Sequence, residues 1–553
     1  MSSDEQMNAT LRRWREGVRG KERRVFRLEE RIEIRIAAIE KRLHQQRFPL
    51  DEWETRNFFY RMPDDIEFTE PDWRKIHVGE NWGGPNVSAY FRRSVTIPDE
   101  MDGKPVMMRM YLGGDSLVTV NGVPHAGLDI FRNELMLTPK AKAGETFDIL
   151  IESYVYWHGG EPNVHAIEIA ELATVDPEIH AAYWDFRAAV KMFALIDLDA
   201  RLRSFLEKTV WEPLKDVAID EPDLQEFKRI LAQAQARLKR EFYDSECFHG
   251  DGLMHMVGHS HLDVVFMWTY GEFVRKVGRT HSTMLRLMET YPEFKFSQSQ
   301  AKIYADMKTH YPALFEQVKQ RVAEGRWEPL GAFWVEPDCN LISGESFVRQ
   351  VMQGQQFWQH EFGYTSRICW QPDVFGVSWA LPQILKRSGI DYFMTNKMVV
   401  WNDTNKWTKN TFWWESPDGS RVLCIIPPGH FIGTLDPDQM MLQWNAFSDR
   451  GTVGESLYTF GWGDGGGGCD AEMLECGRRY SNTPGMVQTH FTTAQQAFTS
   501  IKEKALENNI PVVNDELYLE AHRGTYTSRG RLKRLNRRGE FLLREVELFT
   551  TLA

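Results

Sequence analysis

The hydrophobic positions of this chain change their spacing several times, and each change predicts a different kind of element. Over residues 65–176, short apolar runs alternate with polar turns, as at 90–98, 106–112 and 147–152. Asn121-Gly122 separates two further runs, which is typical of a tight β-hairpin. Several short strands with frequent turns favour a jelly-roll-like β-sandwich domain over 65–176.

Helical spacing dominates on both sides of this region. Apolar residues recur at helical spacing between residues 8 and 48, so we predict an N-terminal helical segment over 1–64. Its many Arg and Lys side chains are interleaved with Glu, which indicates either a solvated helix face or a nucleic-acid-binding arm. Residues 177–250 place Tyr183, Phe186 and Val190 on one helical face, which predicts a helical linker.

From residue 251 onward, strand-like and helix-like stretches alternate. The runs 294–297 and 327–331 are strand-like, and helical spacing is clear at 271–290. This alternation predicts a largely parallel sheet covered by helices, and therefore an α/β catalytic domain over 251–515. Residues 516–553 end in an arginine-rich helical stretch, which we treat as the start of another helical domain.

Composition narrows the class of protein. The formal net charge of −12 over 553 residues leaves no basic surplus for a nucleic-acid partner. No apolar stretch has the length of a membrane span, and the N-terminus has no signal-peptide pattern, so we expect no membrane partner and a cytoplasmic location. The cysteines have no C-x-x-C spacing and are expected to be reduced thiols: Cys247, Cys339, Cys369, Cys424, Cys469 and Cys476.

His261 and Asp263 are the strongest chemical signal. They follow an apolar run that predicts a buried strand, and residues two apart in an extended segment point to the same side. An imidazole nitrogen and a carboxylate oxygen placed there can share one cation, and Zn²⁺ accepts this mixture of ligands. The alternative is a hydrogen-bonded pair at the end of a strand.

Asp373 ends a second short apolar run. Gly376 permits a tight turn after it, and Ser378 is a candidate N-cap for a helix that ends near Gly389. Asp373 therefore lies where a strand gives way to a helix, and in parallel α/β folds the carboxyl ends of the strands carry the chemistry. The alternative is that Asp373 only caps the turn.

Other polar groups follow predicted strands in the same way. Glu336 and Asp338 are candidates for binding substrate hydroxyls, or for capping turns. Asp464 precedes four glycines, which fits an acid on a mobile loop or an aspartate in a glycine linker. His522 and Arg523 can hydrogen-bond to sugars or stabilise a turn. Two carboxylates, a cation site and hydroxyl-binding groups together suggest glycoside hydrolysis.

Six motifs in order extend this picture, and through them the chain resembles the α-mannosidases of glycoside hydrolase family 38, in their cytosolic and vacuolar branch. The resemblance covers about residues 65–553 and rests on these segments: His261-x-Asp263, Trp334-Val335-Glu336-Pro337-Asp338, Pro372-Asp373-x-Phe375-Gly376, Trp401-Asn402-Asp403-Thr404-Asn405, Gly463-Asp464 with Gly465–Gly468, and His522-Arg523-Gly524-Thr525.

The resemblance implies a retaining, Zn²⁺-dependent exo-α-mannosidase with a seven-stranded β/α barrel. It makes His261 and Asp263 metal ligands and Asp373 both a ligand and the catalytic nucleophile, and it places Asp464 in the region of the general acid/base. The implied partner is an α-mannoside or oligomannose substrate, and relatives form homo-oligomers. The residues that we expect to contact substrate are Phe266, Glu336, Asp338, Phe375, His522 and Arg523.

The chain departs from the family pattern in three respects that bear on the site. Val374 and Val377 stand beside Asp373 where relatives commonly carry Thr and Tyr. Phe266 stands where relatives usually carry a Trp floor for the mannose ring, and the fourth metal ligand of relatives is a His in a stretch beyond residue 553. We therefore expect the chain to be the front part of a longer enzyme. Two alternatives stay open: a metal-dependent deacetylase-type hydrolase, and an inactive or carbohydrate-binding fragment.

Overall fold

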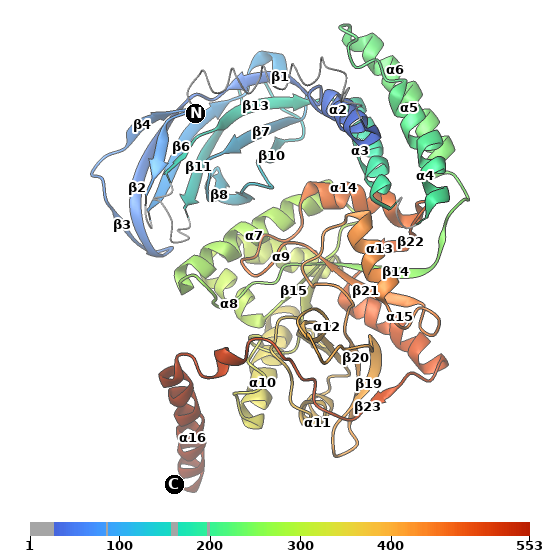
Figure 1. The fold of residues 1–553 in the computed structure, drawn as a ribbon. Coiled ribbons are helices and arrows are strands. Elements are labelled where there is room, and N and C mark those ends of the chain that lie inside the picture. The colour runs from blue at the N-terminus through green and yellow to red at the C-terminus, as the bar shows by residue number, and fades with distance from the viewer. Residues whose placement is uncertain (1–26, 85–86, 156–163, 196–198) are drawn as a thin grey trace, which may run out of the picture. The chain divides into compact units, whose positions relative to one another are not determined.

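The structure, a computed structural model, describes residues 27–84, 87–155, 164–195 and 199–553 (Figure 1). The chain divides into two units, Met1–His44 with Asp176–Ser245, and Gln45–Val175 with Glu246–Ala553. The part of the predicted N-terminal helical segment that precedes residue 27 lies outside the described residues. None of the described helices combines the length and the apolar run that crossing a bilayer requires.

The first unit is helical. Its α-helices are α2 (Leu28–Glu40), α3 (Pro177–Lys191), α4 (Ala200–Leu206), α5 (Glu212–Lys215) and α6 (Leu224–Leu238). The apolar positions of α2 that share one face, Ile32, Ile36 and Ile39, are buried, as are Tyr183 and Phe186 of α3. Hydrophobic burial on one side of each helix therefore holds this unit together, as the helical spacing predicted for residues 177–250.

Two antiparallel sheets form a β-sandwich at the start of the second unit. One sheet has the order β1-β13-β7-β10, and the other runs β3-β2-β6-β11-β8-β9 with β4 paired to β2. The strands of these two sheets are β1 (His44–Pro49), β2 (Glu52–Met62), β3 (Asp65–Phe68), β4 (Arg74–His77), β6 (Ser88–Thr96), β7 (Val106–Tyr111), β8 (Asp115–Val120), β9 (Val123–Leu128), β10 (Glu134–Thr138), β11 (Thr146–Tyr154) and β13 (Ile169–Val175). A separate two-stranded sheet pairs β5 (Asn81–Gly83) with β12 (Val164–Ala166).

The hairpin predicted at Asn121-Gly122 joins β8 to β9, with Val120 paired to Val123. Both turn residues have positive φ, 50° at Asn121 and 79° at Gly122, which is the conformation that a two-residue hairpin needs. The sandwich begins earlier than the expected boundary at residue 65, because β1 and β2 already belong to its sheets. Charged residues such as Glu52, Glu54 and Arg56 alternate with the buried Trp53 and Thr55 along β2. Because so many positions are charged, this segment is not recognisable as a strand from the sequence alone.

Strands and helices alternate after the sandwich, as predicted. The elements are β14 (Gly250–His259), α7 (Tyr270–Thr290), β15 (Phe296–Ser299), α8 (Ala301–His310), α9 (Pro312–Ala323), β16 (Trp327–Leu330), α10 (Gly344–Phe362), β17 (Ile368–Gln371), α11 (Leu381–Arg387), β18 (Tyr392–Thr395), α12 (Lys397–Val400), β19 (Thr411–Glu415), β20 (Arg421–Ile425), α13 (Pro437–Ala446), β21 (Glu455–Phe460), α14 (Ala471–Arg479), β22 (Val487–Phe491), α15 (Ala494–Glu507), β23 (Val512–Val513) and α16 (Gly530–Leu552).

Hydrogen bonds divide these strands between two sheets. One has the order β16-β15-β14-β21 with β22 also on β14, and all of its pairs are parallel. The other has the order β17-β18-β20-β19-β23, with one antiparallel pair, β19 and β20. The fold is therefore α/β with a largely parallel catalytic region, and the seven-stranded barrel that we expected is not confirmed as one closed sheet among the described residues.

Helix α7 packs the sandwich against the catalytic region. Gly127 of β9 donates its N–H to the Thr283 hydroxyl (2.8 Å), and a Cβ at Gly127 would lie 3.1 Å from the Arg279 carbonyl oxygen. The buried Arg275 guanidinium contacts Glu152 of β11 at 2.5 Å and donates to the Ser88 hydroxyl of β6 (2.9 Å). The absence of a side chain at Gly127 and these polar contacts fix α7 on the sandwich.

A pair of histidines lies on the parallel strands, on the side away from the candidate site. His255 contacts Glu455 through Nε2 (2.8 Å) and His490 through Nδ1 (3.1 Å), and Ser500 donates to Glu455 (2.7 Å). The hydrogen bond with His255 is the first cause that lowers the pKa of Glu455. These hydrogen bonds join side chains of three neighbouring strands, and we assign them to the stability of the sheet.

We expect Glu455→Gln to lower the free energy of unfolding by about 1–3 kcal/mol at pH 7, because it removes a charged hydrogen-bond acceptor. A carboxylate whose pKa is lowered in the folded state stabilises the fold at pH values above its unfolded-state pKa, about 4.3. This stabilisation is lost as the pH falls through the lower folded-state pKa. Denaturant unfolding from pH 7 to well below pH 4 measures the difference, with the exposed Glu503→Gln as the control. If the stability difference between the parent protein and Glu455→Gln grew toward acid pH, the stabilising role of the ionised Glu455 would be contradicted.

Candidate active site and metal-binding group

The segment after β14 carries the first two site residues. Leu262 is fully buried and pairs with Gly465 in an isolated β-bridge, so its neighbours His261 and Asp263 face the opposite side. Their side chains meet there, with 3.4 Å between His261 Nε2 and Asp263 Oδ1. The alternation of an extended chain therefore brings together the pair that the sequence predicted.

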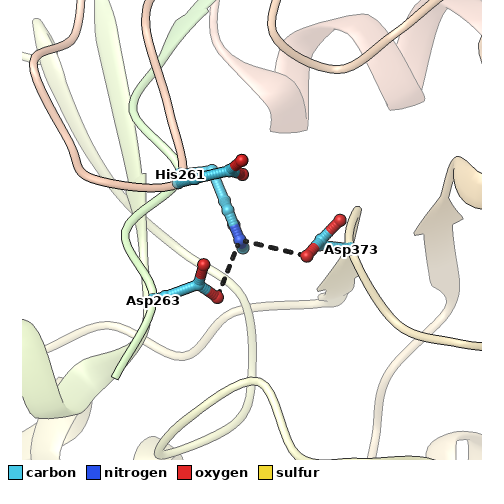
Figure 2. Close-up of side chains that lie close together, drawn as sticks. His261, Asp263 and Asp373 are labelled. Carbon is cyan, nitrogen blue, oxygen red and sulfur yellow. Dashed lines mark ion pairs between the residues drawn. The ribbon is translucent and has the colours of Figure 1, made fainter. Parts of the chain in front are cut away.

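Asp373 reaches the same point from the other sheet. It lies two residues beyond β17, and the following turn contains Gly376 with φ +92°, where a Cβ would lie 3.1 Å from the Leu517 carbonyl oxygen. Helix α11 begins at Leu381 after Ala380 rather than directly after Ser378, whose hydroxyl accepts the N–H of Ala380 (3.4 Å). The Asp373 carboxylate lies 3.8 Å from His261 Nε2 (Figure 2).

Asp464 completes a group of four. His261, Asp263, Asp373 and Asp464 each offer one ligand atom, and these atoms all lie within 4.8 Å of one another. The Asp464 backbone has φ +57°, and its carbonyl oxygen accepts the N–H of Asp263 (2.9 Å), which ties the glycine loop to the first pair. The sequence predicted three metal-binding residues, and the structure places a fourth residue, the carboxylate of Asp464, beside them.

The donor set fits a metal ion. Both ring nitrogens of the buried His261 lack a hydrogen-bond partner among the described residues, although Nε2 faces two carboxylates and Nδ1 lies 3.5 Å from Glu336 Oε1. A buried polar atom without a partner is costly, and a cation at Nε2 would remove this cost. One imidazole and carboxylate oxygens form a ligand set that zinc accepts, and Glu336 stands where a residue that orients a ligand histidine belongs.

Negative charge dominates the electrostatics of the group. Burial disfavours a charged imidazole, yet the carboxylates of Glu336 and Asp263 raise the pKa of His261 well above its usual range. Burial raises the pKa of Asp373 to about 6, although His261 and Lys397 both favour its ionised form. Converging carboxylates repel one another, and the positive charge of one imidazolium offsets this repulsion only in part. A bound dication would offset more of it.

Lys397 is a site residue that the sequence analysis missed. It follows β18 and is 7 % exposed, with Nζ 2.5 Å from Asp373 Oδ1 and 3.5 Å from His522 Nε2. Its ammonium also lies over the rings of Phe375 (5.1 Å) and Trp401 (5.5 Å). Its position in the sequence could have indicated a site residue, because Lys397 comes two residues after the end of a buried strand, as Asp373 does.

The segment 517–522 closes one rim of the site. The buried Asn402 donates to the Tyr518 carbonyl oxygen (3.0 Å) and accepts the N–H of Glu520 (2.8 Å). The Glu520 carboxylate accepts the N–H groups of residues 403–405, and hydrogen bonds to Thr404 are the main cause that lowers its pKa to about 2. One motif of the family resemblance, residues 401–405, therefore holds the segment that leads into another motif, which begins at His522.

The remaining predicted substrate contacts have different surroundings. Phe266 is 59 % exposed, and its ring stands 5.9 Å from that of Trp268. The Asp338 carboxylate accepts the N–H groups of Asn340 and Leu341, which is the turn-capping role left open above. Arg523 is exposed and contacts the Tyr518 ring only loosely, at 5.9 Å. Phe375 and His522 lie together, with ring centroids 4.7 Å apart, next to Lys397.

Comparison with known proteins agrees with this geometry. Residues 251–516 match the N-terminal domain of the glycosyl hydrolases of family 38, and residues 48–169 match the jelly roll domain of α-mannosidases. Alpha-mannosidase 2C1 of Homo sapiens is 33 % identical over 88 % of this chain and 47 % of its own length. Alpha-mannosidase G of Dictyostelium discoideum is 31 % identical over 87 % of this chain and 45 % of its own length.

A third relative, the α-mannosidase of Saccharomyces cerevisiae, is 36 % identical over 53 % of this chain and 28 % of its own length. The chain thus spans about half the length, or less, of the curated relatives that it matches. The matched regions contain most of the sandwich and every member of the four-residue group. The catalytic region of the chain, residues 251–516, therefore belongs by sequence to glycoside hydrolase family 38.

Proposed function

We propose that this protein hydrolyses terminal α-D-mannose residues of α-mannosides with retention of configuration, in a zinc-dependent reaction. The observation that carries the proposal is the distance between Asp373 and Asp464, whose oxygens approach within 4.8 Å. Retaining glycosidases hold their two carboxyl groups about 5–5.5 Å apart, whereas inverting enzymes leave about 6.5–9.5 Å for a water molecule. The short separation favours a covalent glycosyl intermediate.

Asp373 is the nucleophile in this proposal. One of its oxygens faces His261 and Asp263, and the other contacts Lys397 at 2.5 Å, so the carboxylate is held from both sides. A fixed carboxylate close to the anomeric carbon needs little reorganisation to attack, because its orientation is already set. The buried ammonium of Lys397 also favours the ionised carboxylate, which is the nucleophilic form.

Asp464 donates the proton to the leaving oxygen and takes it back from the water that hydrolyses the intermediate. The glycine loop places its carboxylate beside Asp373, while its carbonyl oxygen is bonded to the Asp263 N–H. Residues that would hold zinc are His261, Asp263 and Asp373. When bound, the ion would supply Lewis-acid charge that orients sugar hydroxyls and offsets the repulsion among the carboxylates.

The deacetylase-type alternative has less support from the donor set. Such a hydrolase needs a metal-bound water and a ligand set rich in histidine, whereas this group contains one imidazole and three carboxylates. We also propose that the strand orders β16-β15-β14-β21 and β17-β18-β20 are two arcs of one barrel. Their parallel strands then direct the chemistry of both sheets to one end.

The metal site makes the first prediction here. Protein loaded with Zn²⁺ and then dialysed should retain about one zinc per chain, and His261→Ala combined with Asp263→Asn should retain almost none, because two of the donors are lost. Atomic emission spectrometry measures the content. His490→Gln, on the other side of β14, is the matched control and should keep its zinc. Stoichiometric zinc in the double variant would refute the assigned ligands.

Substrates with good and poor leaving groups distinguish the proposed roles of Asp373 and Asp464. Asp373→Asn should lower kcat for any α-mannoside by roughly 10⁴-fold or more, since the covalent step is lost. Asp464→Asn should lower it by roughly 10²–10⁴-fold for an alkyl mannoside but far less for the glycosylation step of a dinitrophenyl mannoside, which needs no proton. Pre-steady-state kinetics give both values. Equal losses on both substrates in Asp464→Asn would exclude the acid role.

Lys397 is predicted to position the nucleophile. Lys397→Met should lower kcat roughly 10–100-fold, because one oxygen of Asp373 loses its partner, while the zinc content stays unchanged. Steady-state kinetics with an aryl α-mannoside and zinc analysis on the same samples provide the test. The exposed Lys409→Met is the control. If kcat keeps its value in Lys397→Met, the positioning role is wrong.

A further inference from the structure

The backbone pairing between β14 and β15 ends before the chain reaches the metal-binding residues. Its last pair joins His259 to Ser297, two residues short of His261. On the opposite edge, the segment 260–263 is bonded to the glycine loop, where Gly466 donates its N–H to the His261 carbonyl oxygen (3.2 Å). The segment is buried on the edge that faces β15 as well, and buried carbonyl groups need donors. Beyond the last backbone pair, side chains have to supply these donors.

Two glutamine side chains at the end of β15 supply them. Gln298 donates through Nε2 to the Ser260 carbonyl oxygen (2.9 Å), and Gln300 donates through Nε2 to the Leu262 carbonyl oxygen (2.8 Å). Both glutamines are almost completely buried. The carbonyl groups of the residues on both sides of His261 are therefore each held by a buried amide.

The amide of Gln300 also reaches the residue that faces the other ring nitrogen of His261. Its Oε1 accepts the Glu336 N–H (3.1 Å) while its Nε2 is bonded to Leu262, so both ends of the amide are used. The reversed amide would set donor against donor and acceptor against acceptor, which fixes its orientation. The Glu336 carboxylate lies 3.5 Å from His261 Nδ1 and accepts the Ser299 hydroxyl (3.0 Å). One amide thus connects Glu336 to the segment that carries the metal-binding pair.

Gln300 has a strained backbone. It precedes α8 with φ 72° and ψ 106°, a region that residues with a side chain rarely adopt. A glycine would take this conformation at lower cost. Strained residues persist where surrounding contacts fix them, and they gather at functional sites. The two hydrogen bonds of the Gln300 amide are contacts of this kind.

From these contacts, and resting on the proposed zinc site, we propose that Gln300 is a positioning residue for the metal-binding group. Its amide sets the place of Glu336 relative to His261. With the Glu336 carboxylate opposite Nδ1, the proton of the neutral ring stays on Nδ1, and Nε2 is left as the ligand atom beside Asp263 and Asp373. Gln298 holds the same segment, but its amide donates to the carbonyl oxygens of residues 260 and 299.

The test is the affinity for Zn²⁺, measured by competition with a chromophoric chelator. Gln300→Met should weaken zinc binding about 10–100-fold, because contacts that orient a metal ligand have effects of this size. Gln298→Met is the matched control, since it removes a buried amide from the same end of β15 and leaves the bond to Glu336 in place; it should weaken binding by less than about threefold. Unchanged affinity in Gln300→Met, or an equal loss in both variants, would overturn the proposal.

A second variant, Gln300→Asn, keeps the proposal testable if Gln300→Met does not fold. Asparagine tolerates a positive φ, but its shorter side chain cannot reach both Leu262 and Glu336. It should therefore weaken zinc binding about tenfold or more, while circular dichroism shows the fold of the parent protein. The affinity of the parent protein in Gln300→Asn would contradict the positioning role.

A double variant tests whether Gln300 acts through Glu336. Glu336→Gln removes the charge opposite Nδ1 and should by itself weaken zinc binding about 10–100-fold. If the two residues act through one contact, Gln300→Met combined with Glu336→Gln should bind zinc no more weakly than the weaker of the two single variants. Losses that multiply would show independent effects and would refute the proposed role.

Zinc affinity is measured without substrate, which separates this inference from the proposed function. If the parent protein binds zinc but cleaves no α-mannoside, the proposed function fails, and the variants still decide the role of Gln300. If Gln300→Met binds zinc as the parent protein does while mannoside cleavage is observed, only the positioning role is rejected. A parent protein that binds no zinc would reject both.

Discussion

The convergence of carboxylates on one buried imidazole is the constraint around which this site is built. Asp263, Asp373 and Glu336 all lie within 4 Å of a nitrogen of His261, and Asp464 approaches the same point. Like charges at this distance disfavour ionisation in a buried place, so the arrangement needs a compensating cation. Lys397 supplies one such charge from the opposite sheet, and a bound dication would supply the larger share.

This constraint explains why the site draws on segments distant in sequence. The extended segment after β14 brings His261 and Asp263, the turn after β17 brings Asp373, and the glycine loop after β21 brings Asp464. Parallel strands bring their carboxyl ends to one edge, so each short connection adds one or two groups. His255, in the middle of β14, instead contacts Glu455 and His490, and these hydrogen bonds connect neighbouring strands of the sheet.

The sandwich supports the site by contacting two elements of the catalytic region, the glycine loop and α7. Arg132 reaches the carbonyl oxygens of the glycine loop, and Arg275 on α7 is held between Glu152 and Ser88 of the sandwich. A loop with four glycines has a high conformational entropy, which makes an external contact necessary if the acid at 464 is to keep its position. The domain that precedes the catalytic region therefore stabilises the least constrained element of the site.

The sequence by itself determined the elements whose signals are local. The hairpin at Asn121-Gly122, the paired facing of His261 and Asp263, and the strand-to-helix turn at Asp373 follow from backbone rules over a few residues, and the structure places them as predicted. Only the tertiary structure decided the start of the sandwich at β1, the division of the strands between two sheets, and the roles of Lys397, Glu336 and Arg132. Each of these depends on contacts between segments far apart in the chain, such as Lys397 with Asp373 or Arg132 with Gly467. The periodicity of side chains reports only on neighbouring residues and therefore cannot predict such contacts.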